Sequence, residues 1–384
     1  MYVKQLELVD FRSYPQVRLD LAEGPCVFVG GNGHGKTNLV ESLVYLSNLR
    51  SHRVSTDAPL VRAGKDQAIV RAEIVHDERR LIAELAINPG KANQARLGRH
   101  RLTRPRDLLG ALRAIAFAPE DLSLIRGEPS HRRRFLDELL TARNPRFAGV
   151  RADYEKVLKQ RNTLLRTAYL ARKTGGKRTS ASEMGTLEAW DAHLSQLGAE
   201  LLTGRLALLG DLTDHVANAY ATIADGRNPA SLVYTSSLDG EGQPLVSAAV
   251  DAELIAARMS AALAAGRDRE LDRGTTLVGP HRDDLMVNLG ELPAKGYASH
   301  GETWSAALAM RLGAYELLRC DGIAPVLILD DVFAELDEVR RRNLADMVAS
   351  APQTLITCAV VEDVPAKLTG ARFDVWDGEV TRVV

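Results

Sequence analysis

The stretch that decides the fold of this chain reads Gly30-Gly31-Asn32-Gly33-His34-Gly35-Lys36-Thr37. It fits the P-loop pattern Gly-x4-Gly-Lys-Thr at every position. The apolar run 26–29 predicts a buried strand before it, and apolar residues at helical spacing over 39–46 predict a helix after it. This order directs backbone N–H groups at a phosphate, with Lys36 reaching the β and γ phosphates and the Thr37 hydroxyl holding Mg²⁺. The sequence therefore predicts a site for a nucleoside triphosphate.

Length and composition narrow the class of protein. The chain has 384 residues, enough for two domains or for one domain with an insertion, and is 45% hydrophobic and 26% charged, as globular proteins are. No apolar run approaches the ~20 residues that span a bilayer, and residues 1–8 alternate like a strand instead of forming a signal-peptide core. Cys26, Cys320 and Cys358 have neither metal-ligand spacing nor a disulfide pattern. We therefore expect a cytoplasmic protein.

The charge is balanced overall, but arginine is clustered. A net charge of −1 does not by itself indicate a nucleic-acid binder. The two Arg-rich clusters are Arg96, Arg99, Arg101, Arg104, Arg106 and Arg113, and then Arg126, His131, Arg132, Arg133 and Arg134. Arginine makes forked contacts to phosphate, so the candidates for DNA binding are Arg101, Arg104, Arg132, Arg133 and Arg134. The alternative is that each cluster is a solvated helix or loop face.

The order of strand and helix signals predicts an α/β fold with a helical insertion. Residues 1–125 would form the N-terminal part of an ATPase lobe, residues 126–270 a mainly α-helical lobe, and residues 271–384 the C-terminal part of the ATPase lobe. Strands are expected at 2–8, 17–21, 68–75, 81–87, 114–117, 326–329 and 354–358, with a hairpin joining the third and fourth of them.

The helical lobe carries a heptad-like seam. The seam consists of Leu187, Trp190, Leu194, Leu197, Leu201 and Leu208. Residues 154–168 supply a partner stripe, and a polar, Gly-containing linker at 174–180 separates the two. This pattern predicts two antiparallel helices joined by a flexible tip. The heptads are few, so we expect a compact lobe with a short coiled-coil-like arm.

Two acids follow the apolar strand 326–329. Asp330 would bind Mg²⁺, and Asp331 could polarise the attacking water as a general base. Acids after a strand arise by chance, but nearly 300 residues after a P-loop they indicate the second half of an ATPase site. Both acids and Lys36 are therefore the expected catalytic residues.

A third motif runs from Tyr297 to Glu302. Ser299 and Glu302 have the spacing of a capping box, so the motif predicts at least a capped helix over about 303–318. A capped helix N-terminus is also a place where a phosphate binds. Because the chain already has one such site at the P-loop, this second one would suit a phosphate held by a partner subunit.

The order of these motifs resembles the ABC-type ATPase heads of SMC proteins and, more closely, the bacterial RecF family of recombination mediators. The matching stretches are residues 11–14, 33–39, 51–53, 117–122, 132–137, 278–284 and 329–337. They run the length of the chain, and the last two, Val-Gly-Pro-His-Arg-Asp-Asp and Leu-Asp-Asp-Val-Phe-Ala-Glu-Leu-Asp, are nearly diagnostic of that family.

The resemblance implies a fold, cofactors and partners. It implies an ABC-type head with a mixed sheet, ATP on residues 30–38, and Mg²⁺ on Thr37 and Asp330. It implies an ATP-bridged dimer in which Ser299 and Gly301 of one subunit meet the γ-phosphate held by the other, with Asp337 at the seam. It also implies nucleoid-associated repair of gapped DNA or single-strand/double-strand junctions, with RecR and RecO as partners. Arg12 and Arg53 would contact the triphosphate or couple DNA to ATP, or be surface arginines.

The chain departs from the family pattern at several positions. His300 and Glu302 stand where Gln is more usual, and Glu302 brings negative charge close to the phosphate. Glu120 stands where many ABC ATPases have a Gln, so it could face the metal. Thr357 replaces a switch His of transport ATPases, which predicts a weaker γ-phosphate sensor and slow turnover.

The main functional hypothesis is an ATP-gated DNA clamp, a weak DNA-stimulated ATPase that uses ATP as a switch. The alternative is the ATPase subunit of an ABC transporter, which shares the P-loop and the signature motif. A third possibility is a small-molecule phosphotransferase. DNA-stimulated ATPase activity without a membrane would separate the first from the second, and phosphate on an acceptor would identify the third.

Overall fold

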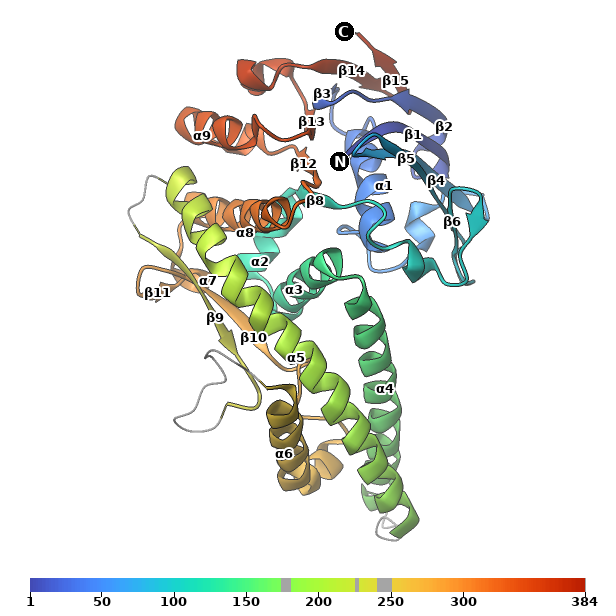
Figure 1. Cartoon of the computed structure of the whole chain (residues 1–384), viewed down its shortest axis with the longest axis vertical. Coiled ribbons are helices and arrows are strands. Elements are labelled where there is room, and N and C mark those ends of the chain that lie inside the picture. The colour runs from blue at the N-terminus through green and yellow to red at the C-terminus, as the bar shows by residue number, and fades with distance from the viewer. Residues whose placement is uncertain (174–180, 225–227, 240–250, 384) are drawn as a thin grey trace. The chain divides into compact units, whose positions relative to one another are not determined.

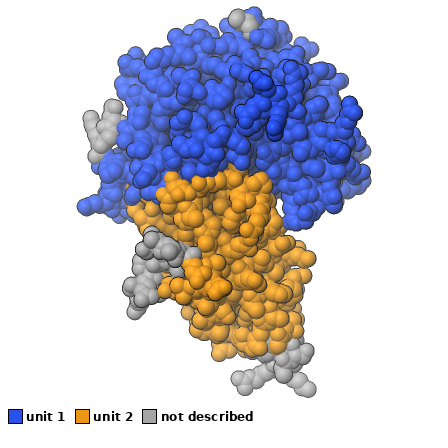
Figure 2. Space-filling model, in the orientation of Figure 1, with its two compact units in different colours: residues 1–126, 212–231, 289–384 blue, residues 127–211, 232–288 orange. Residues whose placement is uncertain are grey.

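The computed structural model describes residues 1–173, 181–224, 228–239 and 251–383, so the predicted linker 174–180 lies outside the described residues. The chain divides into two compact units, shown in Figure 2. Unit 1 comprises residues 1–126, 212–231 and 289–384, and unit 2 comprises residues 127–211 and 232–288. The long helix α5 (Ala181–Ile223) begins in unit 2 and ends in unit 1. The lobe boundaries inferred from the sequence, 125/126 and 270/271, remain a prediction.

An antiparallel sheet forms one layer of unit 1. Its strands, in spatial order, are β2 (Tyr14–Asp20), β1 (Tyr2–Phe11), β4 (Ala68–His76), β5 (Arg79–Ile87), β6 (Gln94–Leu97) and β7 (His100–Arg101). Apolar side chains alternate along these strands, and the inward-facing ones, such as Leu6, Leu8 and Val70, are fully buried. The expected β4–β5 hairpin is confirmed, with Asp77 and Glu78 both at positive φ in its two-residue turn.

A second, mostly parallel sheet carries the P-loop. Its strands, in spatial order, are β15 (Glu379–Arg382), β14 (Ala371–Trp376), β3 (Gly24–Val29), β13 (Gln353–Cys358), β12 (Val326–Asp330) and β8 (Ala114–Phe117). Only β15 runs antiparallel to its neighbour. Every residue of β12 and β13 is buried, as the continuous apolar runs predict for strands covered on both faces.

Helices cover both faces of this parallel sheet. Helix α1 (Lys36–Asn48) follows the P-loop and packs into one hydrophobic core with residues of both six-stranded sheets. Helices α8 (His300–Cys320) and α9 (Glu338–Val348) lie on the other side (Figure 1). The expected mixed α/β head is therefore confirmed. The carboxyl ends of β3, β8, β12 and β13 meet at one edge, where ligands of open α/β sheets bind.

Short elements complete unit 1. These are η1 (Ala58–Leu60), η2 (Pro105–Leu108), η3 (Pro119–Leu122), α2 (Ser123–Arg126), α7 (Ala294–Tyr297), η4 (Phe333–Glu335), η5 (Val361–Asp363) and η6 (Ala366–Leu368). None of the helices in the described part of the chain is long and apolar enough to cross a membrane.

Unit 2 is mainly helical. It contains α3 (Pro129–Arg143), α4 (Arg146–Lys173), α6 (Ala252–Arg273) and the first part of α5. Helices α4 and α5 are antiparallel, because Arg161 pairs with Asp191 and Arg146 pairs with Glu200. Four residues of the predicted seam, Leu187, Leu194, Leu201 and Leu208, are buried, whereas Trp190 and Leu197 are half-buried.

A small sheet was not predicted. Its order is β11 (Leu292–Pro293), β10 (Asp284–Leu289) and β9 (Ala230–Thr235). Strand β9 follows a long helical pattern and has only six residues, of which Ala230, Leu232 and Tyr234 are buried. An alternation of three apolar positions is too short to stand out from such surroundings.

A fully buried ionic network organises unit 2. Arg205 is 2% exposed and donates two hydrogen bonds to Asp137, of 2.8 and 3.0 Å. Its third nitrogen donates to the carbonyl of Pro280 at 2.8 Å. The Tyr234 hydroxyl donates to Asp283 at 2.9 Å, so the residues of the 278–284 motif are tied to α3, α5 and β9. Buried charges are tolerated only with such complete pairing.

Candidate nucleotide-binding site

The P-loop leaves β3 and ends at the first turn of α1. Gly35 caps the helix with φ 108°, in the left-handed region. A Cβ atom there would lie 2.8 Å from the Tyr14 hydroxyl and 2.9 Å from the Ser13 hydroxyl. Tyr14 also donates to the Gly35 carbonyl at 3.0 Å. The β1–β2 turn therefore braces the loop, and only glycine fits at this position.

The Lys36 side chain lies along the loop. It is 3% exposed, and its Nζ donates to the carbonyl of Gly31 at 3.2 Å. This contact holds the positively charged ammonium group within the loop, where it could bind phosphate oxygens. This interaction fits the role predicted for Lys36.

The hydroxyl of Thr37 meets the first acid of β12. Thr37 Oγ1 donates to Asp330 Oδ1 at 3.1 Å, although the two residues are 293 positions apart. Asp330 is 3% exposed, and burial raises its pKa to about 6, helped by the neighbouring Asp331 carboxylate. A buried carboxylate that is costly to ionise alone is stabilised by a cation. A Thr hydroxyl and a carboxylate side by side are hard oxygen ligands, so these residues fit Mg²⁺.

Thr357 joins the two acids. Its hydroxyl donates to Asp330 Oδ1 at 2.5 Å and accepts from the backbone N–H of Asp331 at 2.9 Å. Asp331 has φ 51°, a left-handed conformation that is unusual for a non-glycine residue. The sequence predicted Thr357 only as a substitute for a switch His. In the structure it positions both acids.

Arg12 and Arg53 converge on a carboxylate inside α1. Glu41 is completely buried, and Arg12 donates to both of its oxygens, at 2.9 and 2.7 Å. Burial would raise the pKa of Glu41, but the hydrogen bonds from Arg12 and Ser51 and the arginine charges outweigh it and lower that pKa. The buried acid was not singled out from the sequence, although a Glu among apolar helix residues is a usable signal.

Arg53 extends this group towards Glu120. It donates to Glu41 at 3.2 Å and to Asn38 at 3.0 Å, and its Nε lies 3.7 Å from Glu120. Glu120 lies in η3, just after β8, and its charge contributes to the raised pKa of Asp330. Arg53 therefore links the P-loop helix α1 to Glu120, the residue that stands where many ABC ATPases have a Gln.

The predicted signature residues form a second cluster. Ser299 Oγ accepts from the Glu302 N–H at 3.3 Å, and Glu302 accepts from the Ser299 N–H at 2.9 Å, so the capping box at the start of α8 is confirmed. A Cβ atom on Gly301 would lie 2.8 Å from Nη1 of Arg340. Arg340 pairs with Asp337 at 3.1 Å. Residues 299–302 and Asp337 thus come together around one arginine, whose charge offsets that of Glu302.

The arginines predicted to bind DNA have different surroundings. Arg132 is 4% exposed and donates to both oxygens of Asp284, at 2.8 and 2.9 Å. Arg133 is half-buried and donates to the Asp283 carbonyl at 2.7 Å, and Arg134 is half-buried as well. Nothing in the sequence of α3 indicates that these neighbours differ. A buried, doubly bonded guanidinium does not reach a DNA phosphate, so the expectation for Arg132 is corrected to a structural role.

Arg101 ends a row of charges that crosses the antiparallel sheet. The strand register places Arg18, Glu7, Arg71, Glu84, Arg96 and Arg101 in one line across six strands. Arg71 lies between two acids, donating to Glu7 at 2.6 Å and to Glu84 at 2.7 Å. Signs alternate along the row until Arg96 and Arg101. The β6–β7 end of the sheet, with Arg99 and Arg104 nearby in sequence, is therefore its positive end.

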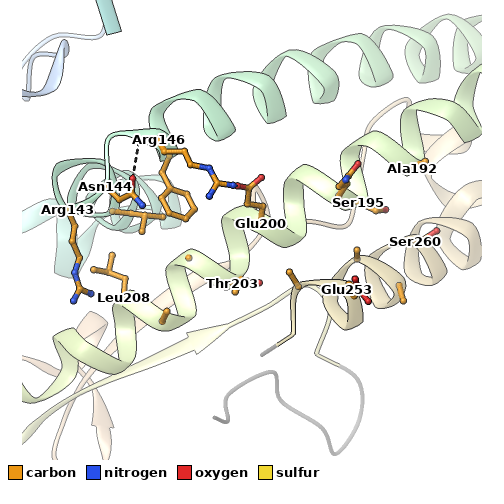
Figure 3. A pocket seen from close by; sticks show the side chains of 18 residues that line it. Arg143, Asn144, Arg146, Ala192, Ser195, Glu200, Thr203, Leu208, Glu253 and Ser260 are labelled. Atoms are coloured by element: carbon orange, nitrogen blue, oxygen red, sulfur yellow. Dashed lines mark hydrogen bonds and ion pairs between the residues drawn. The ribbon is translucent and has the colours of Figure 1, made fainter. Parts of the chain in front are cut away.

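A cavity of about 1110 Å³ lies in unit 2, among α3, α4, α5 and α6 (Figure 3). Its lining is mostly apolar and includes Leu140, Phe147 and Leu208. The Ser195 hydroxyl is buried there without a hydrogen-bond partner. None of the described residues that line it belongs to a glycine-rich loop or to an acid pair like Asp330 and Asp331, so we assign the nucleotide chemistry to the P-loop of unit 1.

Comparisons with known proteins agree with this geometry. The family described as RecF/RecN/SMC N terminal domain matches residues 2–365. A protein of Streptomyces avermitilis named DNA replication and repair protein RecF is 55% identical over 383 residues, covering 100% of both chains. A protein of the same name from Frankia alni is 54% identical, again covering 100% of both.

Solved structures give the same result. One described as "Structure of the recombination mediator protein RecF-ATPrS in RecFOR pathway" superposes with a TM-score of 0.87 at 27% identity, covering 100% of this chain and 98% of the other. An SMC head domain from Pyrococcus furiosus superposes with a TM-score of 0.55 at 16% identity, covering 100% of this chain and 96% of the other, which shows a shared fold. With its P-loop, acid pair and capping-box helix in this arrangement, the chain belongs to the RecF family of DNA replication and repair proteins.

Proposed function

We propose that this chain is an ATP-dependent DNA-binding clamp of recombinational repair, which closes as an ATP-bridged dimer and hydrolyses ATP slowly to release DNA. The observation that carries this proposal is the 3.1 Å contact between the Thr37 hydroxyl and Asp330 beside a braced P-loop. Mg²⁺, when bound to these two residues, would neutralise phosphate charge and polarise the γ-phosphate. Two similar RecF structures are described as RecF-ATPrS and RecF-ATP, which supports ATP as the nucleotide.

The residues of the loop have distinct roles in this proposal. The backbone N–H groups of residues 30–38 bind the phosphates, and Lys36 balances their charge. Asp331, fixed by Thr357, polarises the attacking water. The 299–302 segment and Asp337 would complete the site of a second copy, because the capping-box helix presents its N-terminus beside Arg340.

The DNA-binding residues follow from the charge distribution. We place Arg101 and Arg104 in contact with DNA, since both are exposed at the positive end of the antiparallel sheet. Arg133 and Arg134 remain weaker candidates, because each is half-buried on α3. Such contacts go to phosphates, so binding should depend on salt and be largely independent of sequence.

The proposal extends to DNA structure and partners. A similar RecF is described as a recombination mediator of the RecFOR pathway, which supports RecO and RecR as partners of this chain. Gapped DNA and single-strand/double-strand junctions are the proposed substrates. The transporter-ATPase alternative has less support, because the two relatives from Streptomyces avermitilis and Frankia alni are named as DNA replication and repair proteins.

The mass of the protein in solution tests the clamp. With ATP, Asp331→Asn should accumulate as a dimer, because it binds the nucleotide but lacks the general base that hydrolyses it. Gapped duplex should increase the dimer further, whereas Lys36→Ala, the matched control, should stay monomeric. Light scattering with and without ATP and gapped DNA measures this. A monomeric Asp331→Asn protein that nevertheless binds ATP would contradict the dimeric clamp.

A further inference from the structure

The P-loop carries one ring that its phosphate chemistry does not use. His34 is stacked on the indole of Trp376, with ring centroids 4.2 Å apart and planes inclined by 21°. The backbone N–H of Asp377 donates to His34 Nδ1 at 3.3 Å. The end of β14 and the turn after it therefore hold the His34 imidazole, with Trp376 against its face and the Asp377 N–H at its edge.

That turn lies close to the loop. Asp377 and Gly378 join β14 to β15 with φ angles of 47° and 80°, as in a type I′ turn. Strand β14 runs parallel to β3 with Asp374 opposite Val29, so the turn projects past the point where the P-loop begins. A Cβ atom on Gly30 would lie only 2.2 Å from the Val375 carbonyl oxygen. The hairpin and the loop are thus packed backbone to backbone.

Trp376 keeps most of its surface in solvent despite this packing. It is 69% exposed, which is unusual for the largest apolar side chain. Tyr14 also touches the loop, but it is buried and its hydroxyl is engaged by Gly35. An exposed indole at the rim of a phosphate site is a surface on which a flat base can stack.

We propose that Trp376, with His34 supporting its other face, stacks on the base of the nucleotide whose phosphates occupy the P-loop. The inference rests on the proposed function, since it takes the triphosphate site as given. Stacking responds to the area of the ring and not to its hydrogen-bonding edge. The contact therefore favours purine over pyrimidine nucleotides and leaves the choice between adenine and guanine to other residues.

Binding of ligands with and without a base tests this. Trp376→Ala should weaken ATP binding about tenfold and UTP binding less, while inorganic tripolyphosphate, which has no base, should bind as to the unmodified protein. Trp376→Phe should recover most of the loss, because a smaller aromatic ring still stacks. Trp190→Ala, which removes a tryptophan from α5, is the matched control. Isothermal titration in the presence of Mg²⁺ measures all of these, with a thermal melt to show that each variant is folded.

A second measurement does not depend on removing Trp376. In a Trp190→Phe/Trp304→Phe protein, Trp376 is the remaining tryptophan, and its fluorescence should change with ATP but not with tripolyphosphate. Unchanged ATP affinity in Trp376→Ala, or an equal loss for ATP and tripolyphosphate, would overturn base stacking. If the unmodified protein bound neither ligand, the proposed function itself would be contradicted.

Discussion

At the scale of single residues, Thr357 shows how one hydroxyl can organise two acids. It donates to the side chain of Asp330 and accepts from the backbone of Asp331, which holds the second acid at positive φ. A hydroxyl can do both at once, because it has a donor and two acceptor sites. A histidine at this position could not make both contacts in the same way. Thr357 therefore has a role of its own, which is to position the two acids, and is more than the loss of a switch His.

Replacing this hydroxyl should separate hydrolysis from binding. Thr357→Val keeps the shape of the side chain but removes the Thr357 hydroxyl from Asp330, which retains Thr37, and leaves the Asp331 N–H without its side-chain acceptor. We expect ATP hydrolysis to slow by about ten- to a hundredfold, because small displacements of reacting groups have effects of that size. ATP affinity should change little, since the P-loop provides the phosphate contacts. Steady-state hydrolysis and nucleotide titration measure the two effects.

Thr357→Ser is the control for this prediction. It retains the hydroxyl and should restore most of the activity. Equal rates for the Val variant and the unmodified protein would show that Thr357 does not position the acids.

At the scale of elements, the 278–284 loop depends on a neutral histidine. The Tyr154 hydroxyl lies 2.7 Å from His281 Nδ1, and Nε2 lies 3.3 Å from the Thr276 carbonyl, so the Nε2–H tautomer satisfies both contacts. Burial lowers the pKa of His281 to about 4, and the charges of Arg282, Arg133 and Arg161 act in the same direction. Protonation would turn Nδ1 from an acceptor into a donor.

This loop predicts a loss of stability in mild acid. Between pH 6.5 and pH 4, His281 is protonated in the unfolded chain but stays neutral in the folded protein. The free energy of unfolding therefore falls as the pH falls, by about 2 kcal/mol between pH 7 and pH 5. Urea titrations at the two pH values measure it. His281→Gln should show a smaller decrease, whereas His193→Gln, on the exposed face of α5, should match the unmodified protein.

The sequence predicts the features that depend on local patterns, but not those that depend on contacts between segments distant in the chain. Strands β8 and β12, helix α1 and the capping box at Ser299 follow from local patterns, and the structure confirms them. The burial of Arg132 and the stacking of Trp376 on His34 arise between segments distant in sequence. The sequence does not distinguish Arg132 from the two arginines that follow it. Arg132 differs from them only in the folded protein, where it pairs with Asp284 of the 278–284 loop.

At the scale of the whole molecule, charge predicts which surface meets DNA. The double variant Arg101→Ala/Arg104→Ala should weaken DNA binding and lower the slope of log affinity against log salt by up to about 2, because each arginine would neutralise one phosphate. Arg79→Ala/Arg80→Ala removes two exposed arginines elsewhere on the same sheet and should leave the slope unchanged. Fluorescence anisotropy at several salt concentrations measures these slopes.

Arg132→Ala should behave differently from the surface variants. It leaves Asp284 without its partner, so the free energy of unfolding should fall by about 1–3 kcal/mol while the salt slope stays the same. A reduced slope for this variant alone would return Arg132 to the DNA-binding surface.

The order of strands in the parallel sheet has a consequence for how the protein is made. Strand β3 lies between β13 and β14, and His34 meets Asp377 across 343 positions of sequence. A ribosome delivers β3 long before both of its neighbours, so the P-loop emerges with the bracing β1–β2 turn but without β13 and the β14–β15 hairpin. We therefore expect the chain to bind nucleotide fully only after β14 has been synthesised. A chain released before β14 would lack the hairpin that packs against Gly30 and His34.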